Sequence, residues 1–294
     1  HQALDWITAT GTGSMTAAGA SIPGTHYQKQ GAWAMYAPGM AVVAGGLTAI
    51  DDGVVVNKAF TVDLNSATPV VAYTAPMANA RSFSNSVMLP NGEVMVVGGN
   101  TSGQFFSDLG AMFTPEIWNP TTGQWRGVAD MSVPRNYHSL AMLLPDGRVW
   151  SGGGGLSGDA LTDHQDAQVF TPPQLFNADG TPAVRPVITA APDRIGPASI
   201  FTVNASEGVQ YFSAISMSAQ THSVDTGLRH VRFTHTNPSP GVYAVTAPPS
   251  INVLTPGYWM MFAVDANGVW SVSRIIQVTN STLPVVTNPG QQSV

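Results

Sequence analysis

The chain has 294 residues and a formal net charge of −6; 44% of its residues are hydrophobic and only 10% are charged. This length suffices for one large domain or two ordinary ones. The 11 Lys and Arg residues are too few to favour nucleic acid or an anionic membrane as a partner. No apolar run approaches the length of a membrane span, and the absence of Cys excludes disulfides and thiolate metal sites within this chain. No stretch with the basic start and apolar middle of a cleavable signal remains in this sequence, and because it begins at His1 rather than Met, we expect that an upstream segment has been removed.

Short β-branched and aromatic runs separated by Pro, Gly, Asn and Asp recur along the chain, which predicts an all-β fold. One strand pattern that ends in a glycine pair occurs three times, at residues 40–46, 93–99 and 148–154. The spacing of about 50 residues is the period of kelch repeats in β-propellers. Each copy follows a turn and precedes a strand expected to carry Phe-Thr, at residues 60–61, 113–114 and 170–171. The repeat therefore predicts stacked kelch blades, each a four-stranded antiparallel sheet, over residues 1–180.

This region has room for three to four blades of roughly 50 residues each, fewer than a closed kelch propeller needs. We therefore expect a partial propeller that another chain or segment completes. After residue 180 the glycine pairs stop, and closely spaced strand-like segments follow. Their alternation predicts an immunoglobulin-like β-sandwich over residues 181–281, followed by a tail over 282–294.

Tyr137 and His138 directly precede a predicted β-hairpin at residues 140–151. The internal repeat supplies a comparison, because aligning residues 81–84 with residues 135–138 places Phe-Ser where Tyr-His stands. The blade therefore does not require Tyr-His. A phenol and an imidazole are both ligands that metals such as copper accept. In the structural alternative, Tyr137 packs in the blade and His138 bonds a backbone carbonyl.

The chain resembles the galactose oxidase and glyoxal oxidase group of copper radical oxidases over nearly its whole length, as far as about Asn280. The matching stretches are AMFTPEIWNP at 111–120, VPRNYHSLAMLLPDGRVWSGGGGL at 133–156, DHQDAQVFTP at 163–172, THSVDTGLRH at 221–230 and PGYWMMFAVDANGVWSV at 256–272. Kelch repeats alone are a weak match, whereas Tyr-His before the hairpin together with Thr-His in a following sandwich is a strong one. The resemblance implies a seven-bladed propeller once the missing blades are supplied.

The resemblance also implies roles for individual residues. Tyr137 corresponds to the family's axial tyrosine, the catalytic residue that binds copper and takes the proton from the substrate alcohol. His138 and His222 correspond to two equatorial imidazole ligands, so the implied metal ligands are Tyr137, His138 and His222. Phe106 falls where the family has an aromatic residue lining the substrate pocket, and Phe83 is a second candidate for substrate binding.

The chain departs from the family at two places. Ser157 and Ala160 fall where galactose-oxidising members have a disulfide, so that bond is missing here. The family's second tyrosine ligand and the cysteine bonded to its ring lie upstream of the matched region, and this chain has no Cys. The resemblance thus implies that the tyrosyl-cysteine radical comes from the missing segment or from an N-terminal partner chain that completes the propeller, for example through proteolytic processing of one precursor.

With that partner, the implied function is a copper radical oxidase that uses O2 to convert primary alcohols or aldehydes to aldehydes or acids, with H2O2 as the second product. Such chemistry suits a secreted, periplasmic or cell-surface protein. Two other classes stay open. One is a non-catalytic kelch scaffold or binding module with vestigial metal ligands, and the other is a metal-binding structural subunit of a surface assembly.

Further histidines are interpreted without a catalytic role. His164 lies beside two aspartates in a blade loop and is interpreted as a structural hydrogen-bond partner. His230 and His235 flank a strand expected at the surface and are also interpreted as structural. His26 and Tyr27 repeat the ligand types outside any matched position and are left unassigned.

Overall fold

The computed structural model describes residues 3–23, 29–49, 53–156 and 162–280. Within these ranges the regular structure is strands, apart from a three-residue 3-10 helix, η1 (Pro173–Leu175), so the predicted all-β fold is confirmed. No helix in the described ranges is long and apolar enough to cross a membrane. The predicted tail, His26 and Tyr27 lie outside the described residues.

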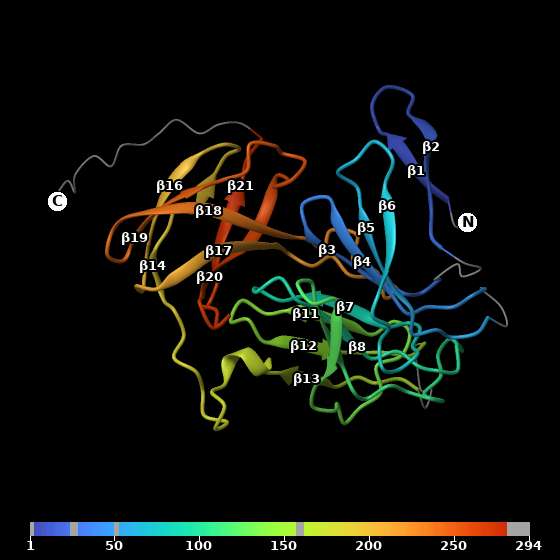
Figure 1. The fold of residues 1–294 in the computed structure, drawn as a ribbon. Helices are drawn as coiled ribbons and strands as arrows, with labels where there is room; N and C mark the ends of the chain where they lie inside the picture. The colour runs from blue at the N-terminus through green and yellow to red at the C-terminus, as the bar shows by residue number, and fades with distance from the viewer. Residues whose placement is uncertain (1–2, 24–28, 50–52, 157–161, 281–294) are drawn as a thin grey trace.

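Three antiparallel sheets form the propeller part, each with its strands in sequence order. The first contains β3 (Ala32–Ala37), β4 (Met40–Ala44), β5 (Ala59–Asp63) and β6 (Val70–Thr74). The second contains β7 (Asn85–Met88), β8 (Val94–Val97), β9 (Glu116–Asn119) and β10 (Gln124–Gly127), and the third contains β11 (Leu140–Leu143), β12 (Val149–Gly152) and β13 (Ala167–Phe170). The first strands lie together, because β7 packs beside both β3 and β11 (Figure 1). These meanders, preceded by the hairpin β1 (Ala3–Thr8) and β2 (Ser14–Ser21), confirm a partial β-propeller.

The predicted Phe-Thr strand is misplaced in the second blade. Phe113 and Thr114 precede β9 instead of lying in it. The reason is a buried guanidinium: Arg81 Nη2 donates to the carbonyl of Thr114 at 3.0 Å, and Arg81 also forms an ion pair with Glu116. The carbonyl of Thr114 therefore accepts a hydrogen bond from a side chain rather than from the backbone of a neighbouring strand.

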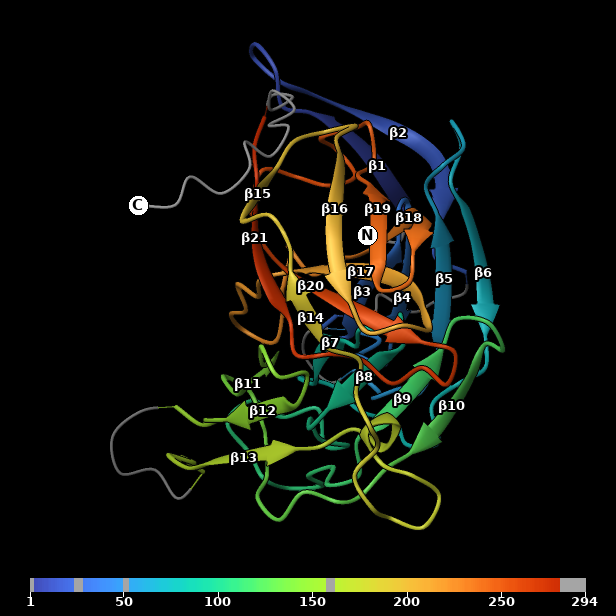
Figure 2. The same ribbon diagram turned by 90° about the vertical axis from the view of Figure 1, so that its left-hand side faces the viewer.

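The C-terminal strands form the predicted immunoglobulin-like sandwich. They are β14 (Ile188–Ala190), β15 (Arg194–Ile195), β16 (Ile200–Ala205), β17 (Val209–Ser216), β18 (His230–Ser239), β19 (Val242–Thr246), β20 (Gly257–Asp265) and β21 (Arg274–Val278). The first half of β18 pairs with β17 and its second half pairs with β19. This long strand therefore connects the layer of β14, β16 and β19 to the layer of β17, β20, β21 and β15. Figure 2 shows these strands above the second and third blades.

The strand β20 is buried on both of its faces, which joins the sandwich to the blades. Side chains alternate along a strand, so neighbouring residues point to opposite sides. Phe262 and Val264 belong to the apolar core shared with the blades, whereas Met261 and Ala263 belong to the core of the sandwich. A strand that is buried on both faces has a continuous run of apolar residues, and residues 259–264 form such a run.

The turns of the blade hairpins dock on the sandwich. Ser213 on β17 donates from Oγ to the carbonyl of Pro90 at 2.8 Å, and Trp270 donates from Nε1 to the carbonyl of Gly147 at 3.3 Å. Gly147 has a φ of +79°, and a Cβ on it would lie 2.1 Å from Trp270 Nε1. Only glycine fits this turn, because both its backbone angle and its contact exclude a side chain.

His230 lies at the junction of the sandwich with the first two blades, so the prediction of a surface position for it is wrong. Its Nδ1 lies 3.1 Å from the carbonyl of Tyr36, and its Nε2 lies 3.4 Å from the carbonyl of Pro90. Burial lowers the pKa of His230 to about 4, despite the two carbonyl groups that favour the charged ring. The imidazole is therefore neutral in the folded protein at neutral pH.

We expect this burial to make the protein less stable in acid. Between pH 6.5 and about 4 the unfolded chain binds a proton at His230 that the folded chain does not bind. The free energy of unfolding should therefore fall on acidification, with a contribution from His230 approaching about 1.4 kcal/mol per pH unit. Urea titrations of the parent and of His230→Gln at a series of pH values measure this. The difference in slope between the two proteins should vanish above pH 7; identical slopes throughout would contradict the assignment.

Candidate metal centre

Tyr137 and His138 lie in the last part of the connection between β10 and β11. This part follows Arg135, whose fully buried side chain donates from Nη1 to the carbonyl of Gly153 at 3.1 Å and forms an ion pair with Asp166 at 3.0 Å. His138 has a φ of +71°, a conformation that is uncommon for a residue with a Cβ. The buried Arg135 therefore fixes one end of a strained segment that leads directly into β11.

His222 lies at the tip of the connection from β17 to β18. Thr221 and Val224 exchange two backbone hydrogen bonds of 2.9 Å, and the residues between them, His222 and Ser223, have φ values of +52° and +62°. Two positive φ values are the backbone of a type I′ turn, which usually carries Asn or Gly. Ser223 is buried and donates from Oγ to the carbonyl of Phe83 at 3.2 Å, which holds the turn against the second blade.

The structure brings the three predicted ligands together. The ring centroids of Tyr137 and His138 are 4.3 Å apart, those of His138 and His222 are 5.0 Å apart, and those of Tyr137 and His222 are 5.8 Å apart. His222 comes from the sandwich and the other two residues come from the third blade. The convergence is observed, whereas binding of a metal by these residues stays a prediction.

The ring nitrogens of both histidines are arranged alike. His138 Nδ1 donates to the carbonyl of Gly155 at 3.0 Å, and His222 Nδ1 lies 2.7 Å from Thr221 Oγ1. The carbonyl at Nδ1 of His138 accepts a proton from that nitrogen and leaves the lone pair of its Nε2 available for a metal ion, whereas the hydroxyl of Thr221 can either donate to or accept from Nδ1 of His222. No group of three His, Cys, Asp or Glu residues in the described ranges could hold a metal, and the set here has only two of these plus a phenol. Two imidazoles and a phenol are a donor set that suits copper.

An aromatic wall covers one side of this group. Phe83, Phe105 and Phe106 have ring centroids 5.4, 4.9 and 5.3 Å from the Tyr137 ring, and Phe106 also contacts His138. The sequence prediction named Phe83 and Phe106 but missed Phe105, although its position beside Phe106 was a usable signal. Phe105 is exposed, whereas Phe83 is fully buried behind it.

The internal repeat is offset by one residue from the alignment predicted above. Tyr137 O accepts from Gly155 N, just as Ser82 O accepts from Asn100 N. Tyr137 is therefore equivalent to Ser82, and His138 is equivalent to Phe83, which also has a positive φ. The prediction that the blade does not require Tyr-His is unaffected by this correction.

Comparisons with known proteins agree with this geometry. Residues 62–163 match the family model described as glyoxal oxidase N-terminus, and residues 185–278 match the galactose oxidase-like, Early set domain. The chain belongs to the galactose oxidase and glyoxal oxidase family.

Among its relatives, a galactose oxidase of Gibberella zeae is 40% identical over 201 residues, which cover 68% of this chain and 30% of that protein. The aldehyde oxidase GLOX1 of Arabidopsis thaliana is 33% identical over 240 residues, or 74% of this chain and 38% of that protein. A solved fungal alcohol oxidase of the AA5 family, in complex with copper, superposes with a TM-score of 0.90 at 33% identity and covers 95% of this chain and 60% of that chain. The chain thus spans less than half the length of these two curated members of the galactose oxidase and glyoxal oxidase family. Ser157 and Ala160, which the resemblance matches to a disulfide of the galactose-oxidising members, lie outside the described residues.

The aromatic wall gives a testable expectation. Phe83→Ala should destabilise the protein by about 3 kcal/mol or more, because it opens a cavity behind Tyr137 and Phe105. Phe105→Ala removes an exposed ring of the same size and should cost less than about 1 kcal/mol. Urea unfolding followed by fluorescence measures both. Equal costs for the two substitutions would show that Phe83 does not support the wall.

Proposed function

We propose that the chain is part of a copper radical oxidase that oxidises primary alcohols or aldehydes with O2. For an alcohol the balanced reaction gives one aldehyde and one H2O2 per O2 consumed. The observation that carries the proposal is the convergence of two imidazoles and one phenol, delivered by two different domains. The copper complex of the related fungal alcohol oxidase supports the choice of metal.

In this proposal Tyr137, His138 and His222 would hold the copper ion. Bound copper would supply a one-electron acceptor and a Lewis acid for the substrate oxygen. The phenol oxygen of Tyr137 takes the hydroxyl proton of the substrate as a general base. The contacts at Nδ1 of the two histidines restrain the orientation of their rings.

The aromatic wall is the proposed substrate-binding surface. Phe105 is exposed and packs against Phe106 and Tyr137, and the fully buried Phe83 supports Phe105 from the protein interior. A wall of this kind excludes water from the reacting groups and orients the carbon that bears the hydroxyl.

The radical cofactor does not fit within this chain, because a tyrosyl-cysteine bond needs a cysteine and the sequence has none. We propose that a further polypeptide, separate or from the same precursor, supplies that group and the remaining blades. The exposed apolar side chains of Trp6, Ile7 and Met15 on the β1–β2 hairpin and of Tyr73 on β6 are consistent with coverage by such blades. We also propose a secreted, periplasmic or cell-surface location, where release of H2O2 is tolerated.

Substitution of the ligands tests the copper site. His222→Ala should weaken Cu(II) binding by more than about 100-fold, because a direct ligand contributes more than the outer partners whose loss costs 10–100-fold. Tyr137→Phe should retain much of the copper but lose turnover, because the ring cannot accept a proton. Electron paramagnetic resonance and metal analysis of the protein measure binding, and oxygen uptake by the assembled enzyme measures turnover. His235→Ala, a histidine of the sandwich away from this site, is the matched control. Tight Cu(II) binding by His222→Ala would refute the proposed site.

The supply of the radical group is tested by the intact mass of protein purified from its natural source. We expect additional polypeptide carrying a tyrosine-cysteine bond, seen as a loss of about two mass units relative to its sequence. A single species of the mass of this chain, monodisperse in solution, would exclude the proposed partner.

A further inference from the structure

The third blade carries one more residue than the second blade at the point where the site begins. The arginines Arg81 and Arg135 are equivalent, because each donates from Nη1 to a carbonyl of its own glycine pair. Yet Arg81 is followed at once by Ser82, the equivalent of Tyr137. Asn136 is therefore an insertion between the anchoring arginine and the phenol, and it adds one residue between Arg135 and Tyr137 that the second blade lacks between Arg81 and Ser82.

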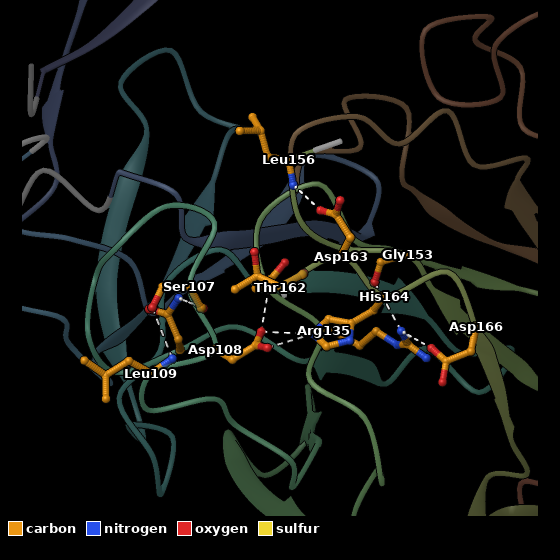
Figure 3. A network of polar contacts seen from close by, with 12 residues as sticks. Ser107, Asp108, Leu109, Arg135, Gly153, Leu156, Thr162, Asp163, His164 and Asp166 are labelled. Carbon is orange, nitrogen blue, oxygen red and sulfur yellow. Dashed lines mark hydrogen bonds and ion pairs between the residues drawn. The ribbon is translucent and has the colours of Figure 1, made fainter. Parts of the chain in front are cut away.

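The inserted residue is held by a carboxylate from another blade. Asn136 is buried and donates from Nδ2 to Asp108 Oδ1 at 2.6 Å and to the carbonyl of Thr162 at 3.3 Å. His164 Nε2 lies 3.0 Å from both carboxylate oxygens of Asp108 and donates to them. Figure 3 shows Asp108 between Ser107 and Leu109, with its carboxylate directed at His164.

This cluster joins three segments that shape the site. Asp108 lies two residues after Phe106, in the loop that forms the aromatic wall. Asn136 precedes Tyr137. His164 donates from its backbone N–H to the carbonyl of Gly154 at 3.0 Å, next to Gly155, which accepts from His138 Nδ1. Hydrogen bonds to the carboxylate of Asp108 therefore connect the loop of the aromatic wall with the segments that hold Tyr137 and His138.

We propose that Asp108, oriented by His164, is a positioning residue that sets the geometry of Tyr137 and His138 and places the aromatic wall over them. The carboxylate provides two acceptor oxygens for donors that come from two different segments, and a hydrogen bond to a carboxylate is stronger than one between neutral groups. The proposal rests on the proposed copper site for its functional meaning, but the geometry that it describes can be measured without metal.

The test uses Asp108→Ala and His164→Ala, with His164→Gln as the conservative variant and Asp130→Asn as the control. The introduced glutamine has no ring, but its amide can still donate to Asp108, so His164→Gln should recover part of the effect of His164→Ala. Asp130 is a matched carboxylate because it accepts from Thr114 Oγ1 at 2.5 Å without touching the cluster. All variants are first compared by urea unfolding, and binding is measured where each is fully folded.

We expect Asp108→Ala to weaken Cu(II) binding at least about 10-fold and to change the Cu(II) electron paramagnetic resonance spectrum. Loss of a residue that orients metal ligands without binding the metal itself has effects of this size. Asp130→Asn should change neither. A purely structural hydrogen bond would lower the stability of Asp108→Ala and leave the affinity and the spectrum of the folded protein unchanged, and that result overturns the proposal.

A crystal structure of metal-free Asp108→Ala separates this proposal from the copper assignment. The centroids of Tyr137 and His222, now 5.8 Å apart, should move relative to each other, and the wall should leave Tyr137. If the parent protein binds no copper but the rings move, the proposed function fails and the positioning role stands. Rings that keep their places refute the positioning role, whatever the metal does.

Discussion

The burial of β20 on both faces is the constraint on which the site depends. Each large apolar side chain removed from water contributes about 1.5–3 kcal/mol, and Phe262 and Val264 make this contribution to the blades while Met261 makes it to the sandwich. The sandwich therefore cannot tilt away from the blades without exposing a shared core. The neighbouring β17 leads directly into the connection that carries His222, so the position of that imidazole is set by the core rather than by the loop alone.

Backbone strain is concentrated around the candidate centre. Seven described residues other than glycine have a positive φ, and five of them are at the site: Phe83, Phe106, His138, His222 and Ser223. Each such conformation costs on the order of 1–3 kcal/mol and persists only where the surroundings enforce it. Here the enforcement comes from Arg135, from the hydrogen bond of Ser223 to Phe83, and from aromatic packing. Rings held in this way lose little freedom when they bind a ligand, which favours tight and specific coordination.

Sequence patterns were sufficient for the elements of the fold but not for the environment of each residue. The glycine pairs and turns predicted three blade sheets, because those features depend on local backbone angles. Alternation along a strand predicts a surface position for His230, because the pattern cannot reveal that two blades cover this residue. Phe113 and Thr114 were placed in a strand because the competing demand of a buried guanidinium is not visible in the local pattern. Convergence of His138 with His222 was inferred from the family resemblance, since spacing in the chain gave no physical reason for it.

The second and third blades show how the candidate centre differs from the equivalent part of a neighbouring blade. Arg81 and Arg135 make the same bond to a glycine pair, and the β7–β8 and β11–β12 pairs have equivalent registers, so the first hairpin of the two blades is the same. What differs is one inserted residue and two side chains, Ser82 and Phe83 in one blade against Tyr137 and His138 in the other. An insertion in a rigid meander must be accommodated by contacts outside it, because the arginine before it and the strand after it are both fixed. The carboxylate of Asp108 meets that requirement from the neighbouring blade, which couples the shape of the wall to the place of the phenol.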